Sequence, residues 1–242
     1  MARILLLGGT TEARDLAQRL VAAKADAITS LAGRTPRPDY RGKVRIGGFG
    51  GADGLTAYLR RERIDVLVDA THPFATVMSP NALAACTTAG IPYLRLERPP
   101  WTAGPGDDWR EVHTLHHAER LLPFGARVFL AVGAHSVEPF LGRSDLALVV
   151  RAILRPDDGG HPNFAFVKAR PPFDLEEDRA LFQTHHIEWI VAKNAGGTAA
   201  DAKLRAARKL GIPVAMVRRP TGQPLPDAAT AADMMTQLAA HL

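Results

Sequence analysis

The sequence predicts an α/β protein with two Rossmann-like, doubly wound parallel-sheet domains. Apolar stretches alternate with amphipathic stretches along the 242-residue chain, the order expected when helices connect parallel strands. Two glycine pairs, Gly8-Gly9 and Gly196-Gly197, each stand between a predicted strand and a predicted helix. A segment rich in proline and glycine, at 98–108, separates the halves. We therefore expect domains at 1–100 and 101–242, with a ligand-binding cleft between the carboxyl ends of their sheets.

The alternation assigns elements to both halves. In the first half, strands are expected at 3–8, 27–32, 44–47, 66–69 and 93–96, with helices at 11–23, 52–63 and 74–89. In the second half, strands are expected at 128–132, 146–152, 164–168, 189–192 and 214–217, with helices at 115–122, 174–186, 198–210 and 230–242. The helix at 198–210 has an apolar face that includes Leu204 and Ala207, and Lys203 is expected on its charged face.

Composition limits the class of protein. Hydrophobic residues make up 46% of the chain, enough for packed cores. No apolar run approaches the roughly 20 residues of a membrane helix, and no signal peptide is visible, so we expect a cytoplasmic protein that does not enter the membrane. The single cysteine, Cys86, excludes internal disulfides and cysteine-rich metal sites and is expected in a helix core. No metal site is expected, because the His-His pairs at 116–117 and 185–186 fall on helices, where adjacent side chains diverge.

The charge balance favours an anionic small molecule. Thirty Lys and Arg stand against 25 Asp and Glu, a formal charge of +5. Aromatic residues make up only 6% of the chain and are not interleaved with basic ones, so nucleic-acid binding is not expected. Several cations near predicted strand ends would suit a polycarboxylate if they share one rim, although they also fit an ordinary solvated surface: Arg151, Arg155, Lys168, Arg170, Arg218 and Arg219.

The first glycine turn is the leading candidate for a phosphate cradle. A strand that turns through Gly8 and Gly9 into a helix beginning near Thr10, Thr11 and Glu12 presents backbone N–H groups and the positive end of the helix dipole to an anion. The spacing is not the Gly-x-Gly-x-x-Gly of the commonest dinucleotide fingerprint. A tight turn followed by a helix capped by Thr10 or Thr11 is the alternative.

The end of the second predicted strand indicates NADPH rather than NADH. An NAD-binding Rossmann domain usually carries an acidic residue there for the ribose 2′-hydroxyl, whereas this chain has Gly33, Arg34 and Thr35. Arg34 could pair with a 2′-phosphate, or it could be an exposed loop residue. After the third strand, Gly48 permits close ligand approach, and Phe49 could flank an adenine or pack under its own loop.

The most distinctive motif follows the fourth predicted strand. Asp69 could orient the turn by accepting backbone N–H bonds, and Thr71 could donate to a carboxamide or phosphate. His72 is the candidate catalytic group, because imidazole transfers protons near neutral pH, and Pro73 stiffens the turn. A histidine that only fixes the turn is the alternative.

A second cradle is expected at the other glycine pair. Gly196 and Gly197 lie between a strand and a helix. Lys193 and Asn194 would face the substrate, and Thr198 would cap the helix.

Taken in order, these motifs resemble the precorrin-6A reductase family of cobalamin biosynthesis. The resemblance spans almost the whole chain, and the heptad Asp69-Ala70-Thr71-His72-Pro73-Phe74-Ala75 is its distinctive element. It implies two Rossmann-like domains and NADPH-dependent reduction of one carbon–carbon double bond of the tetrapyrrole precorrin-6A, giving precorrin-6B. It also implies that residues 9–12 and 33–35 hold the cofactor, that 71–74 lie near the nicotinamide, and that 193–197 hold the macrocycle.

Several hypotheses remain open from the sequence. The substrate could be cobalt-precorrin-6A, the chain could be a different NADPH reductase of an anionic metabolite, or it could be an NADPH sensor without catalytic activity. Neighbouring enzymes of the cobalamin pathway are candidate partners. The proton donor is not assigned, since water or a substrate carboxyl could replace His72.

Overall fold

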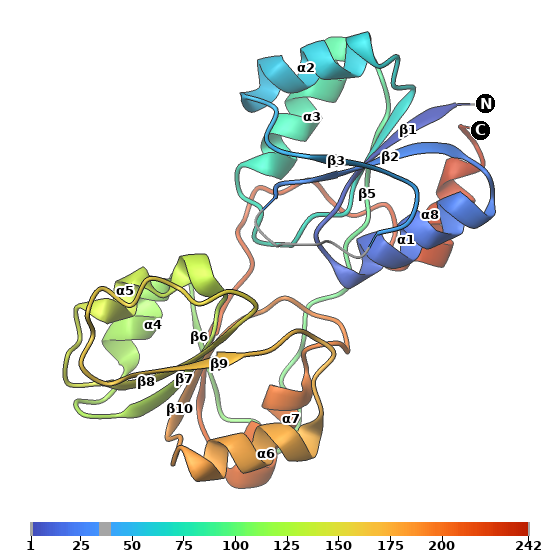
Figure 1. The fold of residues 1–242 in the computed structure, drawn as a ribbon. Helices are drawn as coiled ribbons and strands as arrows, with labels where there is room; N and C mark the ends of the chain where they lie inside the picture. The colour runs from blue at the N-terminus through green and yellow to red at the C-terminus, as the bar shows by residue number, and fades with distance from the viewer. Residues whose placement is uncertain (1, 34–39, 242) are drawn as a thin grey trace. The chain divides into compact units, whose positions relative to one another are not determined.

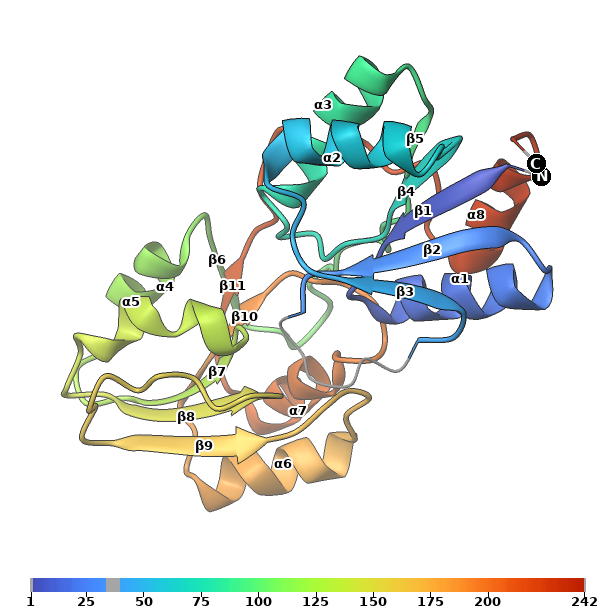
Figure 2. The same cartoon turned by 45° about the horizontal axis from the view of Figure 1, so that its top comes forward.

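The computed structural model describes residues 2–33 and 40–241 and divides into two compact units. The first unit contains 1–99 together with 220–242, and the second contains 100–219. Each unit is built on one parallel sheet with helices on both faces, as Figures 1 and 2 show. The α/β class with two doubly wound sheets is confirmed.

The first sheet has five parallel strands in the order β3-β2-β1-β4-β5. Its strands are β1 (Arg3–Leu7), β2 (Asp26–Leu31), β3 (Lys43–Ile46), β4 (Val66–Asp69) and β5 (Tyr93–Arg95). The helices are α1 (Thr11–Ala22), α2 (Gly51–Arg61), α3 (Met78–Ala89) and α8 (Ala231–Leu238). Residues of β1 alternate between two cores: Ile4 and Leu6 pack with α1 and α8, whereas Leu5 and Leu7 pack with α2 and α3.

The end of the chain completes the first unit rather than the second. After 219 the chain forms a parallel bridge between Ala228 and Leu96, and α8 then buries Met234 and Leu238 in the core that α1 covers. The expected domain at 101–242 therefore differs from the structure at 220–242. The sequence shows that this helix has an apolar face, but not which sheet it covers.

The second sheet has six parallel strands in the order β6-β11-β10-β7-β8-β9. They are β6 (Trp109–Val112), β7 (Arg127–Ala131), β8 (Ala147–Ala152), β9 (Phe164–Lys168), β10 (Trp189–Lys193) and β11 (Val214–Val217). The helices α6 (Leu175–Thr184) and α7 (Ala202–Leu210) lie on one face, and α4 (Leu115–Leu121) and α5 (Glu138–Leu141) on the other (Figure 1). A short 3-10 turn, η1 (Ala134–Ser136), precedes α5.

Most expected elements occur within a few residues of their predicted bounds, but β6, η1 and α5 were not expected. Two helices begin later than predicted, because the residues before them form turns: α3 begins at Met78 rather than Phe74, and α7 begins at Ala202 rather than Thr198. The prediction that Lys203 lies on the charged, exposed face of α7 is wrong. Its side chain is only 4% exposed, and its ammonium lies 4.5 Å from the centroid of the Trp101 ring.

Two expectations from composition can be compared with the described part of the chain. Cys86 is buried in α3, as expected, and burial raises the pKa of its thiol to about 12. None of the helices at 2–33 and 40–241 is both long enough and apolar enough to cross a membrane.

The packing of α8 gives a stability prediction. Met234 is fully buried in the first core, so Met234→Ala should lower the free energy of unfolding by about 2–5 kcal/mol, the usual range for such a truncation. The exposed Gln237 on the same helix supplies the control Gln237→Ala, expected within about 0.5 kcal/mol of wild type. Both are measured by urea denaturation. Equal midpoints for the two variants would mean that α8 does not support the first core.

Candidate functional site

Each sheet has one place where the strand order reverses direction. In the first sheet it lies between β1 and β4, and in the second between β7 and β10. Loops that leave the carboxyl ends of such neighbouring strands diverge to opposite faces of the sheet, and open α/β sheets bind ligands there. The predicted site motifs at 8–12 and 69–73 follow β1 and β4, and that at 193–198 follows β10.

The glycine turn after β1 has the shape of an anion cradle. A Cβ atom on Gly8 would lie 2.9 Å from Cδ2 of Leu31 and 3.2 Å from Cγ2 of Thr29, so a larger residue here would require side chains of β2 to shift. At Gly9 an added Cβ would meet nothing within 4 Å, so the turn is open. The amides of the first turn of α1, including that of Thr11, have no carbonyl of their own helix to reach. Open space beside such amides suits a phosphate.

Thr10 caps α1, as the alternative to a phosphate cradle predicted. Its side chain also bonds across the switch point between β1 and β4. Its Oγ1 accepts from the Ala13 amide at 3.1 Å and donates to the carbonyl of Ala70, after β4, at 2.9 Å. Capping and anion binding are compatible, because the cap uses the amide of only one residue. Tyr40, which the sequence analysis missed, accepts from the Gly9 amide at 3.0 Å.

Glu12 has a different position from the one its motif suggested. Its carboxylate forms an ion pair with Arg98, which lies next to the point where the chain leaves the first unit at residue 99. Glu12 thus fixes the exit of the chain from the first unit, and only its backbone amide is suited to an anion.

The third glycine turn is held by an arginine that the sequence analysis did not single out. Arg45 donates to the carbonyl oxygens of Gly47 and Gly48, each at 2.6 Å, and to Oγ of Ser30 at 3.1 Å. Its guanidinium lies 3.7 Å from the centroid of the Phe49 ring. Phe49 therefore packs within its own loop, the second of the two expected roles. Arg34 and Thr35 lie outside the described residues.

Asp69 is the centre of a buried polar network. The residue is fully buried, and its Oδ1 accepts from the amide and the hydroxyl of Thr71, at 3.0 and 2.6 Å. Its Oδ2 accepts from Tyr93 at 2.8 Å and from Nη1 of Arg95 at 2.9 Å. Burial, together with the neighbouring Asp69 charge, raises the pKa of the Tyr93 phenol, which keeps it a donor. Asp69 accepts hydrogen bonds from the turn, as expected. Because its carboxylate is fully buried, Asp69 can influence a ligand only through the turn that it holds.

His72 is part of that turn. Its Nδ1 accepts from the amide of Phe74 at 3.2 Å, so the proton of the neutral ring belongs on Nε2. Pro73 between them is buried. The expected start of the helix at Phe74 or Ala75 is wrong, because the Phe74 amide donates to the His72 ring and the Ala75 amide donates to the His72 carbonyl at 2.8 Å, which closes a turn before α3.

The motif after β10 is bonded mainly to its own unit. Asn194 donates to the carbonyl of Trp101 at 2.9 Å and accepts from its amide at 2.8 Å. The Trp101 indole donates to the carbonyl of Gly197 at 2.7 Å, and Arg219 donates to the carbonyls of Asn194 and Ala195. Thr198 is not the helix cap, because the cap position is Asp201 and α7 begins at Ala202. The loop is tied to its own unit by these hydrogen bonds, and the side chain of Asn194 holds Trp101.

Lys193 ends β10 and faces the loop that follows β7. Its Nζ donates to Oγ of Ser136 at 2.6 Å. Burial lowers the pKa of the Lys193 ammonium.

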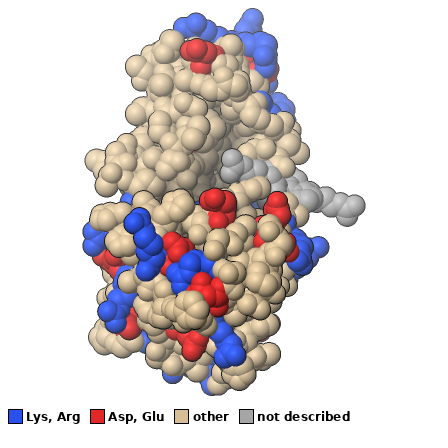
Figure 3. Space-filling view, turned by 90° about the vertical axis from the view of Figure 1, so that its left-hand side faces the viewer, with Lys and Arg blue, Asp and Glu red and all other residues tan. Residues whose placement is uncertain are grey.

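The cations near strand ends do not all form a basic rim. Arg151 is buried in an ion pair with Asp178, and Arg218 pairs with Glu111. On the face of the second unit that Figure 3 shows, acidic and basic side chains are interspersed. The net charge of the chain is therefore a weak guide to a binding surface.

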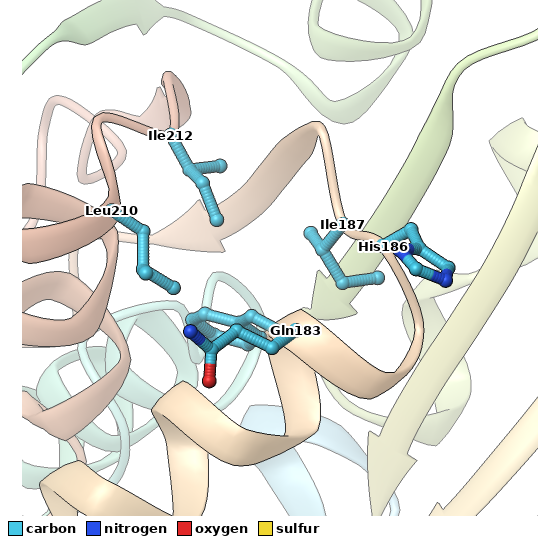
Figure 4. A pocket seen from close by; sticks show the side chains of 6 residues that line it. Gln183, His186, Ile187, Leu210 and Ile212 are labelled. Carbon is cyan, nitrogen blue, oxygen red and sulfur yellow. The ribbon is translucent and has the colours of Figure 1, made fainter.

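One pocket lies away from these loops. It has a volume of about 370 Å³ and lies between the ends of α6 and α7; Figure 4 shows residues that line it, including Gln183, His186, Leu210 and Ile212. These residues come just before β10 and β11 begin, at the amino edge of the sheet. The pocket is separate from the carboxyl-edge loops, and no cluster of metal-ligating side chains occurs in the described ranges.

Comparison with known proteins agrees with this architecture. The family model described as precorrin-6x reductase CbiJ/CobK matches residues 3–240. A precorrin-6A reductase of Rhodococcus erythropolis is 47% identical over 236 residues, covering 96% of this chain and 94% of the relative. One from Rhodobacter capsulatus is 44% identical over 245 residues, covering 100% and 97%. A solved structure of CobK precorrin-6A reductase superimposes with a TM-score of 0.93 at 45% identity, covering 100% of this chain and 97% of that one.

The buried network around Asp69 makes a testable prediction. Asp69→Asn removes one of the two carboxylates that pair with the buried Arg95, leaving Glu97, and should lower the free energy of unfolding by about 3 kcal/mol. Asp15→Asn removes the partner of Arg19 in an exposed pair with an N–O distance of 3.0 Å and should cost about 0.5 kcal/mol or less. Chemical denaturation of both variants measures the difference. Equal losses would show that the buried pair has no special role in stability.

Proposed function

The chain belongs to the precorrin-6x reductase family, and we propose that it reduces one carbon–carbon double bond of precorrin-6A with NADPH, giving precorrin-6B. Family membership makes it an oxidoreductase. The observation that carries the proposal is the match of the whole chain, in sequence and in fold, to precorrin-6A reductases. A cytoplasmic location, as expected from the sequence, is part of the proposal.

The first unit has the features that a dinucleotide cofactor needs. Its strand order, β3-β2-β1-β4-β5, is that of a Rossmann domain, with the glycine turn after the central strand β1. The close approach at Gly8, the open space at Gly9 and the amides of the first turn of α1 fit a pyrophosphate. When bound, NADPH would supply the hydride.

Preference for NADPH is supported by the side chains at the end of β2. Ser30 occupies the last part of this strand, where Arg45 donates to its hydroxyl, and the next residues contribute no carboxylate. A 2′-phosphate would gain from the positive field of Arg45 and, in our proposal, from a direct pair with Arg34.

The turn at 71–74 is proposed to lie beside the nicotinamide. Thr71 and His72 follow β4 at the switch point, next to the turn after β1. Nδ1 of His72 accepts from the Phe74 amide at 3.2 Å, which fixes the orientation of the ring beside the switch point and places the hydrogen of the neutral tautomer on Nε2. This geometry favours orientation of a ligand by His72 over proton donation.

The second unit is proposed to hold the macrocycle. A tetrapyrrole with acetate and propionate arms is polyanionic, and Lys193, Asn194 and the glycine pair Gly196-Gly197 lie at the carboxyl end of β10, where open α/β sheets bind ligands.

Cobalt-precorrin-6A is the second candidate substrate. A cobalt-precorrin-6A reductase of Priestia megaterium is 32% identical over 232 residues and covers 90% of both chains. The higher identities, 47% and 44%, to precorrin-6A reductases favour the metal-free substrate.

The proposed reaction predicts a simple kinetic result. Anaerobic incubation with precorrin-6A should consume NADPH, followed by its near-ultraviolet absorbance, with a simultaneous change in the tetrapyrrole spectrum. NADH should be used far less efficiently, since it lacks the 2′-phosphate. Absence of NADPH consumption by protein that binds NADPH tightly would contradict the reductase proposal and favour the sensor.

The cofactor preference predicts a specific effect of Arg34. Arg34→Ala should raise the KM for NADPH by the equivalent of about 1.5–3 kcal/mol, the range for a charge-assisted hydrogen bond, and leave the KM for NADH nearly unchanged. Arg41→Ala, which removes another arginine of the same stretch, should change neither. Equal effects of Arg34→Ala on both cofactors would exclude contact with the 2′-phosphate.

A further inference from the structure

A tyrosine from the segment between β2 and β3 bridges the backbone of the first glycine turn. The phenol oxygen of Tyr40 accepts from the Gly9 amide at 3.0 Å and donates to the carbonyl of Thr10 at 3.2 Å. Burial raises the pKa of the Tyr40 phenol, so the phenol keeps the hydrogen that the second bond requires. One side chain thus ties together two successive residues of the turn that leads into α1.

The turn has space for this phenol because residue 8 is glycine. Gly8 does not have a positive φ, so its backbone conformation alone does not require glycine. A Cβ atom at this position would lie 3.2 Å from the Tyr40 hydroxyl, in addition to its close approach to the side chains of β2. A larger residue would have to displace the phenol or those side chains. The small residue at position 8 and the bridge by Tyr40 therefore belong to one arrangement.

The ring of Tyr40 is held by contacts that do not involve its hydroxyl. It packs against the core that α1 and α8 share. The guanidinium of Arg14, on α1, lies 5.8 Å from the centroid of the ring. Removal of the oxygen alone should therefore leave the ring in place, so the contribution of the hydroxyl can be measured separately.

The phenol is better suited to fixing the turn than to contacting a phosphate. A phenol has one hydrogen, and that of Tyr40 is given to the carbonyl of Thr10. The oxygen then has only acceptor capacity, whereas a phosphate needs donors such as the amides at the start of a helix. By holding Gly9 and Thr10, Tyr40 keeps the first amides of α1 in a constant position after β1. Donors that are already in place bind a ligand more tightly, because less conformational freedom is lost on binding.

We propose that Tyr40 is a positioning residue for the cofactor, whose hydroxyl fixes the turn after β1 so that the first amides of α1 stay in place for the pyrophosphate. This inference rests on the proposed function, in which the first unit binds NADPH. Tyr40 shares the segment between β2 and β3 with Arg34, the residue proposed to pair with the 2′-phosphate. A loss of affinity can therefore arise at either end of the cofactor, and fragments of the cofactor separate the two.

The test compares Tyr40→Phe with Tyr58→Phe, which makes the same change in α2, where the ring packs against Phe49. Calorimetric titration of the full-length protein uses NADPH, ADP, which carries the pyrophosphate, and 2′-AMP, which carries only the phosphate of the other end. Tyr40→Phe should weaken binding of NADPH and ADP roughly 3- to 10-fold, as for the net loss of a hydrogen bond. Its binding of 2′-AMP should equal that of wild type, and Tyr58→Phe should match wild type with all three ligands.

Amide hydrogen exchange of the ligand-free protein tests the bridge itself. Tyr40→Phe should speed exchange at Gly9, which loses its acceptor, and leave exchange unchanged at the buried Leu5 of β1, which reports that the unit is folded. Unchanged exchange at Gly9 would overturn the proposal.

The binding results separate the role of Tyr40 from the reaction. Unchanged affinity of Tyr40→Phe for ADP, or equal losses of affinity for ADP and 2′-AMP, would overturn the proposal even if reduction of precorrin-6A is confirmed. If wild type binds NADPH but does not reduce precorrin-6A, the proposed function fails, while the comparison of ADP with 2′-AMP still decides the role of Tyr40. Absence of NADPH binding by wild type would overturn both.

Discussion

The buried ion pair between Arg95 and Asp69 is the interaction on which the arrangement of the first unit depends. Arg95 is 1% exposed and Asp69 fully buried, so each charge needs its partners. Arg95 also donates to Ser79 of α3 at 2.7 Å and to Glu97, and its amide donates to Asp227 in the returning C-terminal segment. Asp69 in turn holds the amide and hydroxyl of Thr71. The pair therefore joins β4, β5, α3 and the end of the chain beneath the turn proposed to face the nicotinamide.

The two units place different chemistry at the same position in their sheets. At the β1/β4 switch point, the glycine turn leads into α1, whose first-turn amides have no carbonyl of their own helix to reach, and Thr10 caps only the Ala13 amide. At the β7/β10 switch point, side chains rather than backbone groups meet, since Nζ of Lys193 donates to Oγ of Ser136 at 2.6 Å. Backbone amides suit the evenly spread charge of a pyrophosphate, and a lysine with a hydroxyl suits a single carboxylate. This difference supports assigning the cofactor to the first unit and the macrocycle to the second.

Features that a local sequence pattern determines could be predicted from the sequence, whereas features that depend on a distant partner could not. The apolar run of β1 and the heptad from Asp69 to Ala75 contain enough local information to predict a buried strand and a specialised turn. Lys203, Asn194 and Glu12 were assigned to solvent or ligand, yet each bonds to residues at 98–101 or stacks on Trp101. Tyr40 and Arg45 were missed because their contacts arise only when loops from separate strands meet. The return of α8 to the first core is of the same kind, since periodicity identifies an apolar face but not its partner.

Amide hydrogen exchange with each ligand alone would test most directly whether the two switch points bind different molecules. NADP⁺ alone should slow exchange at 9–12 and 71–74, after β1 and β4. The tetrapyrrole alone should slow it at 133–136 and 193–197, after β7 and β10. Protection of 133–136 and 193–197 by NADP⁺, with no change at 9–12, would contradict the assignment of cofactor and substrate to the two units.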